Sequence, residues 1–221
     1  MFTTAPPFWN GVGGGGCSVV LTEDFSAGAA PWTNVPPDGG AADFVMDSFG
    51  LAFHAKPITS FGAYTNLDRT YSPVDVVVNR VELRCKVGSP SGTRDDGVEI
   101  RLLDTAGSLR CGILVARETY YDAANRMSVW VNGVQRFLGG SRLPTNEWVL
   151  VRIDLKAGAG AALWRIEKIS DGSLWDSGSF GGGEDTGAAF SFAKIRLRAE
   201  ASAGNTVQES WLDNLSLQYC T

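Results

Sequence analysis

Apolar and polar residues alternate one by one along most of this chain, and this period of two restricts the fold more than any other feature. In residues 80–87, every second side chain is apolar and the residues between are charged. The same pattern recurs in residues 98–103, 109–115 and 149–155. Because successive side chains of a β-strand point to opposite faces, each segment is predicted to be a strand with one buried face.

Turn-forming residues separate the alternating segments. The chain has 27 glycines, and the dipeptides Asn132-Gly133 and Asp171-Gly172 are typical of tight hairpin turns. Roughly a dozen short strands with turns every 8–12 residues predict an all-β sandwich or barrel. No segment offers a convincing amphipathic helix, and no fixed repeat indicates a propeller or a solenoid.

The strand pattern indicates which cysteines can form a disulfide. Residues 80–87, 98–103 and 109–115 are predicted to form an antiparallel meander, whose first and third strands would lie about 10 Å apart. A disulfide requires Cα atoms within about 7 Å. Cys85 and Cys111 are therefore expected to be unbonded, buried thiols. Cys17 and Cys220 flank the first and last predicted strands and are the natural disulfide candidates.

Length and charge limit the domains and partners. The 221 residues suit one large β domain, which we expect to span residues 17–221. The net charge is −5, and lysines and arginines are dispersed along the strands without a cluster, so nucleic acid is not the expected partner. No apolar run approaches the roughly 20 residues of a membrane span, so no membrane partner is expected either.

The N-terminal segment, residues 1–16, is predicted to be a flexible arm. Phe2, Phe8 and Trp9 precede the four glycines of residues 13–16, which favour flexibility. Two interpretations remain: the arm folds back onto the sandwich, or it binds a neighbouring subunit through its aromatic residues. The segment lacks the basic and apolar regions of a signal peptide, so export by a cleaved signal is not expected.

Two pairs of motifs resemble a known family. The first pair is Leu21-Thr22-Glu23-Asp24-Phe25-Ser26 with Trp211-Leu212-Asp213-Asn214-Leu215-Ser216-Leu217, and the second is Trp130-Val131-Asn132-Gly133 with Asn146-Glu147-Trp148-Val149-Leu150-Val151-Arg152-Ile153. Together they resemble concanavalin A-like jelly rolls of the laminin-G and carbohydrate-binding type, over roughly residues 18–220. The resemblance implies a two-sheet antiparallel β-sandwich whose first and last strands pair, which would bring Cys17 to Cys220 as a disulfide.

The resemblance also implies a structural calcium ion where the terminal strands meet. Glu23, Asp24 and Asp213 occupy comparable positions, and carboxylate oxygens suit this cation. Asp213 shares the parity of Trp211 and Leu215, so it is expected to point inward, where a carboxylate needs a partner. The alternative is that arginine or backbone amides supply that partner. No other cofactor is expected.

No catalytic residue is predicted. Glycosidases of this fold place three carboxylates on alternate residues of one strand, and that pattern does not occur in the sequence. Asp95, Asp96 and Glu99 are expected to be solvated charges. His54 is the only histidine, so any Ser-His-Asp or Cys-His site would have to use it, and a structural role is expected.

Aromatic residues are the candidates for sugar binding. Trp32, Tyr120 and Tyr121 could stack on sugar rings from loops, although most aromatic residues of a sandwich lie in the core. That core role is expected of Trp130, Trp148 and Trp164.

The leading hypothesis for function is a non-enzymatic structural protein of a bacteriophage virion, either a capsid decoration or a fibre- or tail-associated module. Such a protein would contact other virion proteins and copies of itself, and would be made in the host cytoplasm without a signal peptide. Domains of the resembling type occur in this setting. A carbohydrate-binding, lectin-like module is the alternative, and a glycoside hydrolase is a third, less favoured one.

Overall fold

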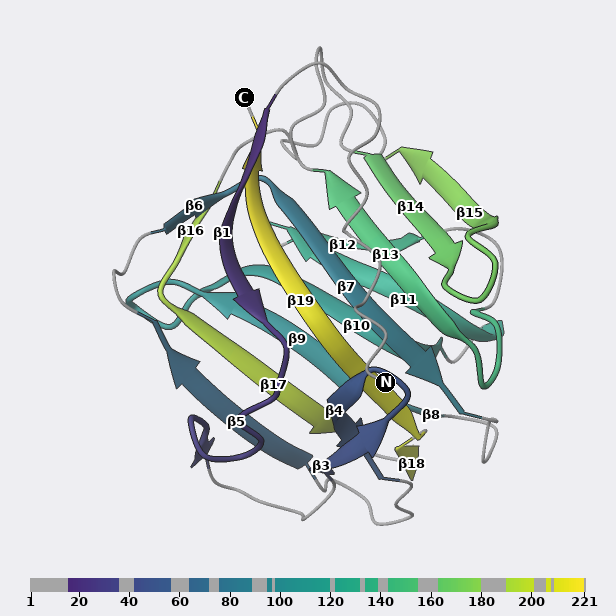
Figure 1. The fold of residues 1–221 in the computed structure, drawn as a ribbon, viewed down its shortest axis with the longest axis horizontal. Helices are drawn as coiled ribbons and strands as arrows, with labels where there is room; N and C mark the ends of the chain where they lie inside the picture. Colours follow the sequence, from purple (N-terminus) through teal and green to yellow (C-terminus); the bar gives the residue numbers. More distant parts are fainter. Residues whose placement is uncertain are drawn as a thin grey trace, which may run out of the picture.

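The computed structural model describes most of the chain, in the segments 16–35, 42–56, 64–71, 76–88, 95–96, 98–119, 122–131, 134–138, 143–154, 163–179, 190–200, 206–207 and 209–220. Two antiparallel sheets face each other across one core (Figure 1). No helix in these segments is long and apolar enough to cross a membrane.

The first sheet, here the terminal sheet, contains both terminal strands. Its order is β15-β14-β13-β7-β19-β4-β3, with β1 paired to β19 beside that path. Figure 1 shows β1 lying alongside β19, the longest strand of this face. The bounds are β1 (Cys17–Glu23), β3 (Ala42–Asp47), β4 (Gly50–Ala55), β7 (Arg80–Val87), β13 (Trp148–Asp154), β14 (Leu163–Lys168), β15 (Leu174–Ser179) and β19 (Ser210–Cys220).

The second sheet, here the opposite sheet, has the order β12-β11-β10-β9-β17-β5-β2. Its strands are β2 (Thr33–Val35), β5 (Tyr64–Thr70), β9 (Val98–Leu103), β10 (Leu109–Thr119), β11 (Asp122–Val131), β12 (Val134–Leu138) and β17 (Lys194–Glu200). Two short pairs complete the described strands: β6 (Val76–Val78) with β16 (Phe190–Phe192), and β8 (Asp95–Asp96) with β18 (Thr206–Val207).

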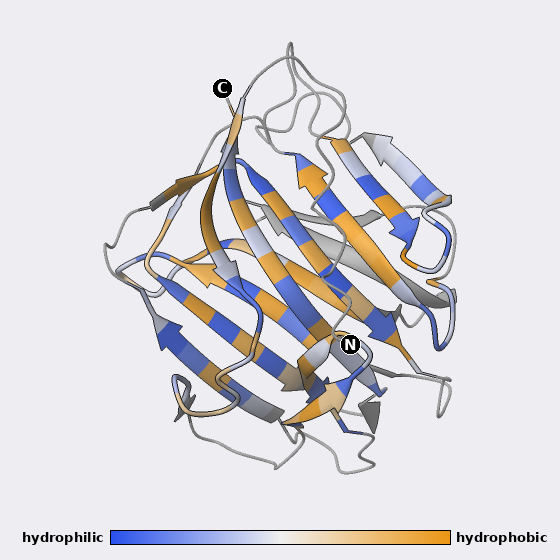
Figure 2. Ribbon diagram, in the orientation of Figure 1, coloured by the Kyte–Doolittle hydropathy of each residue, from blue (hydrophilic) through white to orange (hydrophobic). Residues whose placement is uncertain are grey.

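The core lies between the two sheets, as the alternation predicted. Figure 2 shows apolar and polar residues alternating along the strands of both sheets. Burying each large apolar side chain contributes roughly 1.5–3 kcal/mol to folding. The largest fully buried side chains come from both sheets and from the segments that join them: Phe25, Phe53, Phe192, Leu83, Ile100, Ile113, Ile153, Ile195 and Leu197.

The predicted meander is wrong in its first strand. β9 and β10 pair as expected, but β7 belongs to the terminal sheet, where it pairs with β13 and β19. The alternation of apolar residues shows which face of a strand is buried. It does not show which sheet the strand joins, because strands of both sheets bury one face in the same core. Cys85 and Cys111 are nevertheless unbonded and buried, one in each sheet, and burial raises the pKa of both thiols to about 12.

Because of a β-bulge in β19, the expectation that Asp213 points inward together with Leu215 is wrong. Asn214 has a φ of 46°, and the register with β7 shifts between Asp213 and Ser216. As a result Leu212 and Leu215 are both buried in the core, whereas Trp211 and Asp213 lie on the other side of the strand. Asp213 is buried, as expected, but on the outer face of the sheet.

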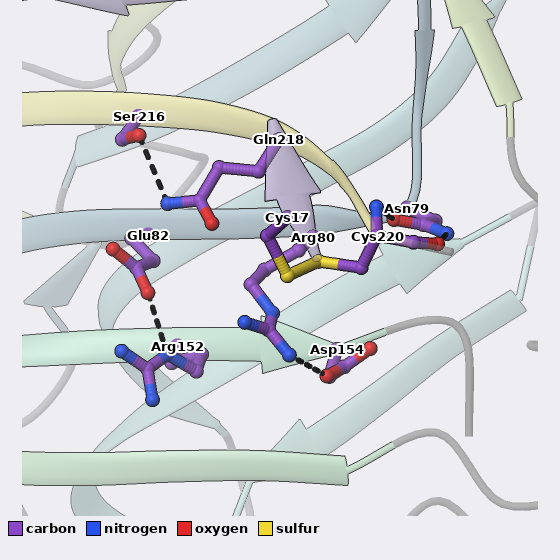
Figure 3. The surroundings of a disulfide bond; sticks show 9 residues. All are labelled: Cys17, Asn79, Arg80, Glu82, Arg152, Asp154, Ser216, Gln218 and Cys220. Atoms are coloured by element: carbon purple, nitrogen blue, oxygen red, sulfur yellow. Dashed lines mark hydrogen bonds and ion pairs between the residues drawn. A yellow bond between two sulfur atoms is a disulfide. The ribbon is translucent and has the colours of Figure 1, made fainter. Parts of the chain in front are cut away.

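Cys17 and Cys220 are joined by a disulfide that connects the start of β1 to the end of β19 (Figure 3). The two residues are direct partners in the β1–β19 register, with Cα atoms 4.0 Å apart. Asn79 fixes the same end of β19, because its side chain donates to the Cys220 carbonyl at 2.8 Å and accepts from the Cys220 amide at 2.7 Å. The first and last strands therefore pair as the resemblance implied.

Candidate functional site

A row of directly paired residues crosses five strands on the outer face of the terminal sheet. Trp148 pairs with Lys86, Lys86 with Trp211, Trp211 with His54, and His54 with Asp43. Directly opposed residues on one face of a sheet are close neighbours whose side chains interact. We call these five residues the aromatic row.

The Lys86 ammonium lies between the two indoles of the row. Its Nζ is 4.0 Å from the centre of the Trp211 ring and 5.1 Å from that of Trp148. Asp47 Oδ2 accepts from Lys86 Nζ at 2.5 Å, and Asp47 Oδ1 accepts from the Trp148 indole at 3.2 Å. Burial raises the pKa of Asp47, but hydrogen bonds from Lys86, the Ser48 amide and Trp148 together hold it below its usual value. The cation–π contacts and this carboxylate fix the rings in place.

His54 extends the row toward β3. Its ring stacks on Trp211, with centroids 4.9 Å apart and an interplanar angle of 16°. Nδ1 lies 2.9 Å from Asp43 Oδ1, and Nε2 lies 3.1 Å from Glu209 Oε1. Among the described residues, both ring nitrogens of His54 thus contact carboxylates.

The β3–β4 turn brings an exposed aromatic ring to the same surface. Phe49 is 38% exposed and packs edge-on against Trp148, with ring centroids 5.7 Å apart. The Arg84 guanidinium lies 4.9 Å from the centre of the Phe49 ring. This face therefore offers apolar rings beside cations and carboxylates, a combination suited to a ligand that has both apolar faces and hydroxyl groups.

Glu23, a predicted calcium ligand, is already fully engaged by protein groups. It is 4% exposed; Oε1 accepts from the Phe25 amide at 3.0 Å, and Oε2 accepts from the Tyr71 hydroxyl at 2.8 Å and from Arg69. Burial and the adjacent Glu23 carboxylate raise the pKa of Tyr71. Arginine or backbone amides were the alternative partners expected for Asp213. In the structure, an arginine and a backbone amide are instead partners of Glu23.

Asp24 and Asp213 do not complete a calcium site with Glu23. Asp24 accepts from Ser26, whose hydrogen bonds lower its pKa. Asp213 accepts from the Asn214 amide at 2.8 Å and from its side chain at 2.5 Å, yet burial raises the Asp213 pKa to about 6. Across the described segments, no group of three or more His, Cys, Asp or Glu side chains is arranged to hold a metal ion. The residues present do not fit calcium.

The structure excludes one sugar-binding candidate and leaves the others outside its described residues. Trp32 is buried at 8% exposure in the core, where it stacks on Phe25, so it presents no surface to a ligand. Tyr120, Tyr121 and the arm residues Phe2, Phe8 and Trp9 lie outside the described residues.

Two further expectations need correction. Glu99 is not a solvated charge, because it is 5% exposed and pairs with Arg101. Trp148 is buried, as expected, but on the outer face rather than in the core between the sheets, where Trp164 lies. Sequence reasoning missed the aromatic row because its members come from five strands, and only the register brings them together.

Solved structures with the same fold include phage proteins and lectins. A carbohydrate esterase of the Shiga toxin-encoding bacteriophage phi24B matches with a TM-score of 0.56 and 14% identity, over 93% of this chain and 100% of the other. The CBM2 module of the evolved Dit protein of Lactobacillus casei BL23 phage J-1 matches with a TM-score of 0.57 and 12% identity, over 93% and 97%. Lectin II of Ulex europaeus matches with a TM-score of 0.55 and 10% identity, over 91% and 100%.

These similarities establish the fold as a concanavalin A-like jelly roll, as the sequence motifs implied. No protein-family model and no curated protein sequence matches the chain.

Proposed function

We propose that this jelly roll is a non-catalytic, lectin-like module that binds glycans through Phe49 and the half-buried members of the aromatic row, with the buried Trp148 supporting the Phe49 ring. The observation that carries the proposal is the paired row itself: two indoles, an ammonium, an imidazole and a carboxylate side by side on one outer face. Sugars present apolar C–H faces to aromatic rings and hydroxyls to charged groups, so such a surface meets both requirements. Two of the three similar solved structures named above are a CBM2 module and a lectin, which supports this choice.

A non-catalytic role agrees with the surroundings of His54. Nucleophilic catalysis by serine or cysteine needs a base within hydrogen-bond reach of the nucleophile. The His54 nitrogens bond Asp43 and Glu209 instead. One similar structure is a phage carbohydrate esterase, but at 14% identity the similarity indicates a shared fold and not a shared catalytic activity.

Replacing Phe49 by Ala is expected to weaken glycan binding about tenfold, because an exposed ring that stacks on a ligand contributes roughly 1 kcal/mol or more. Trp211→Phe, which keeps a ring but removes the larger indole surface, should weaken it less. A glycan array with the full chain identifies the ligand, and calorimetry then measures the affinities of both variants.

The matched control is Trp175→Ala. Trp175 is a half-buried tryptophan on β15, at the edge of the same sheet, that packs against the core and has the Lys168 ammonium 4.9 Å from its ring centre, so it lies away from the aromatic row. If Trp175→Ala and Phe49→Ala reduce affinity equally while the thermal midpoint is kept, or if no glycan is bound at all, the proposed site is wrong.

We also propose that the domain is part of a phage particle, where it contacts other virion proteins and copies of itself. Two of the similar structures are phage proteins that this fold covers almost end to end, which favours such a role. Residues 1–16 would then supply the contacts through Phe2, Phe8 and Trp9, with residues 17–221 as the folded domain.

Removing residues 1–16 is expected to convert a defined oligomer into a folded monomer, since the deletion removes those aromatic contacts and leaves the described sandwich intact. Light scattering gives the mass of each form, and circular dichroism shows whether the strands persist. A full chain that is monomeric, or a truncated chain that assembles normally, would contradict the role of the arm.

A further inference from the structure

A stripe of polar residues on the outer face of the terminal sheet is buried, although no described strand lies over it (Figure 1). On β7 and β19 these residues alternate with core residues such as Leu83 and Leu217, so their side chains point outward. We call them the polar stripe, and they are only 1–8% exposed: Glu82, Arg84, Asp213, Ser216 and Gln218.

The burial is confined to a band that is about two strands wide. Val19 on β1 lies directly opposite Gln218 on one margin and is 60% exposed. On the other margin, beyond β13, the side chain of Arg165 is 41% exposed. The Phe49 ring covers part of Arg84, but Gln218 lies toward the other end of the stripe. Because glutamine is mostly exposed on open protein surfaces, a narrow cover with the width of an extended chain accounts for this band.

The cover comes from the same chain. The exposed fractions are those of a single chain, with no neighbouring molecule present. Residues 1–15 are the longest stretch outside the described residues. They lead through Gly16 into Cys17 at the start of β1, and β1 borders the stripe because Val19 pairs with Gln218. Residues 1–15 are therefore the segment best placed to cover the stripe.

Length and turn chemistry allow residues 1–15 to lie along the stripe. An extended chain of this length reaches up to about 50 Å. The stretch of β19 from Cys220 back to Asp213 measures only about 23 Å. Because Cys17 lies at the Cys220 end, a segment on the stripe must reverse its direction before β1 begins. The four glycines of residues 13–16 permit this reversal, since glycine adopts backbone angles that other residues avoid.

The charges of the stripe also fit this occupant. Two ion pairs, Glu82–Arg152 and Arg80–Asp154, lie in and beside the stripe near the disulfide (Figure 3). Cations and carboxylates thus balance each other on this face. Residues 1–16 contain no charged side chain but three aromatic rings, and guanidinium groups stack on such rings. An uncharged aromatic segment therefore matches the stripe better than an acidic or a basic partner.

We propose that residues 1–15 dock in cis on the polar stripe, as a strap across the outer face of the terminal sheet. The occupant is the N-terminal segment of the same chain, with aromatic rings stacked on the arginines in and beside the stripe. This docking depends neither on the glycan site nor on assembly. A chain that also contacts a neighbouring copy through its arm must first release the arm from this face.

Digestion with chymotrypsin tests the docking, because cleavage of a docked segment follows the fraction of chains in which it is released. The full chain and a synthetic peptide of residues 1–16 are digested under the same conditions, and mass spectrometry follows cleavage after Phe8 and Trp9. We expect cleavage about tenfold slower or more in the full chain, at any protein concentration. Equal rates in chain and peptide would overturn the proposal. Protection that appears only at high protein concentration would overturn the cis assignment in favour of a second copy.

Ser216→Lys and Thr22→Lys are a matched pair of variants. Ser216 is buried in the stripe, whereas Thr22, its direct partner on β1, is exposed on the same face. Ser216→Lys places a charged side chain beneath the strap and should raise the cleavage rate close to that of the peptide. Thr22→Lys should leave the protection unchanged. Circular dichroism checks the fold of both, and Gln218→Lys replaces Ser216→Lys if that variant does not fold. Equal protection in the stripe variant and in Thr22→Lys would overturn the position assigned to the strap.

Discussion

Breaking the Cys17–Cys220 bond is expected to lower the free energy of unfolding by about 5 kcal/mol. The two cysteines are 203 residues apart in the sequence, so the bond closes nearly the whole chain into a loop. In the chain-entropy model, a loop of that size restricts the unfolded state by this amount. The loss is a third or more of the stability of a typical domain and corresponds to a fall in the thermal midpoint of roughly 10–20 °C.

The folded state should change little when the bond is removed. Asn79 still holds the Cys220 backbone through two hydrogen bonds, and β1 still pairs with β19 along six register positions. Urea unfolding of the oxidised protein, the reduced protein and the Cys17→Ser/Cys220→Ser variant measures the effect. Reductant should not destabilise the double variant further, because Cys85 and Cys111 are unbonded. A difference below about 1 kcal/mol between oxidised and reduced protein would contradict the expectation.

Replacing Glu23 by Ala is expected to cost about 3 kcal/mol of unfolding free energy. The change removes the acceptor for the Phe25 amide, the Tyr71 hydroxyl and the Arg69 guanidinium at a position that is 4% exposed. Removing one partner of a buried ion pair leaves the other charge without compensation, and that penalty dominates the loss. Glu23→Gln should cost less, since its carbonyl oxygen still accepts one of these hydrogen bonds.

Glu167→Ala supplies the comparison for the same ion-pair chemistry at the surface. Glu167 pairs with Arg165, whose side chain is 41% exposed, and an exposed pair of this kind contributes about 0–1 kcal/mol. Denaturant unfolding of the three variants under one buffer condition separates the two cases. Equal stabilities for Glu23→Ala and Glu167→Ala would show that the Glu23 network does not stabilise the end of β1.

Local patterns in the sequence predicted most strands and most of the core. Val81, Leu83, Cys85 and Val87 are buried because a strand alternates its side chains between two faces, and that alternation is visible in one segment alone. The hairpin between β11 and β12 is likewise local, with Val131 paired to Val134 around the predicted two-residue turn. The prediction for Asp213 was wrong because a bulge changes the parity of β19 at Asn214. Asparagine tolerates the positive φ found there, but one asparagine within an alternating segment does not specify a bulge.

The candidate sites depend on contacts that no local pattern contains. Lys86 meets Trp148 and Trp211, which are 62 and 125 positions further along the chain, because β7 lies between β13 and β19. Arg84 meets Asp213 for the same reason, with β7 beside β19.

The sequence by itself determined that the chain forms a β-sandwich and which face of most strands is buried, because those properties follow from the period of the side chains within each strand. Only the tertiary structure decided which sheet each strand joins and which polar residues share an outer face. The physical reason is that both sheets bury their apolar faces in one common core, so the apolar pattern is the same for either sheet. The register between distant strands then sets the neighbours of every charged residue.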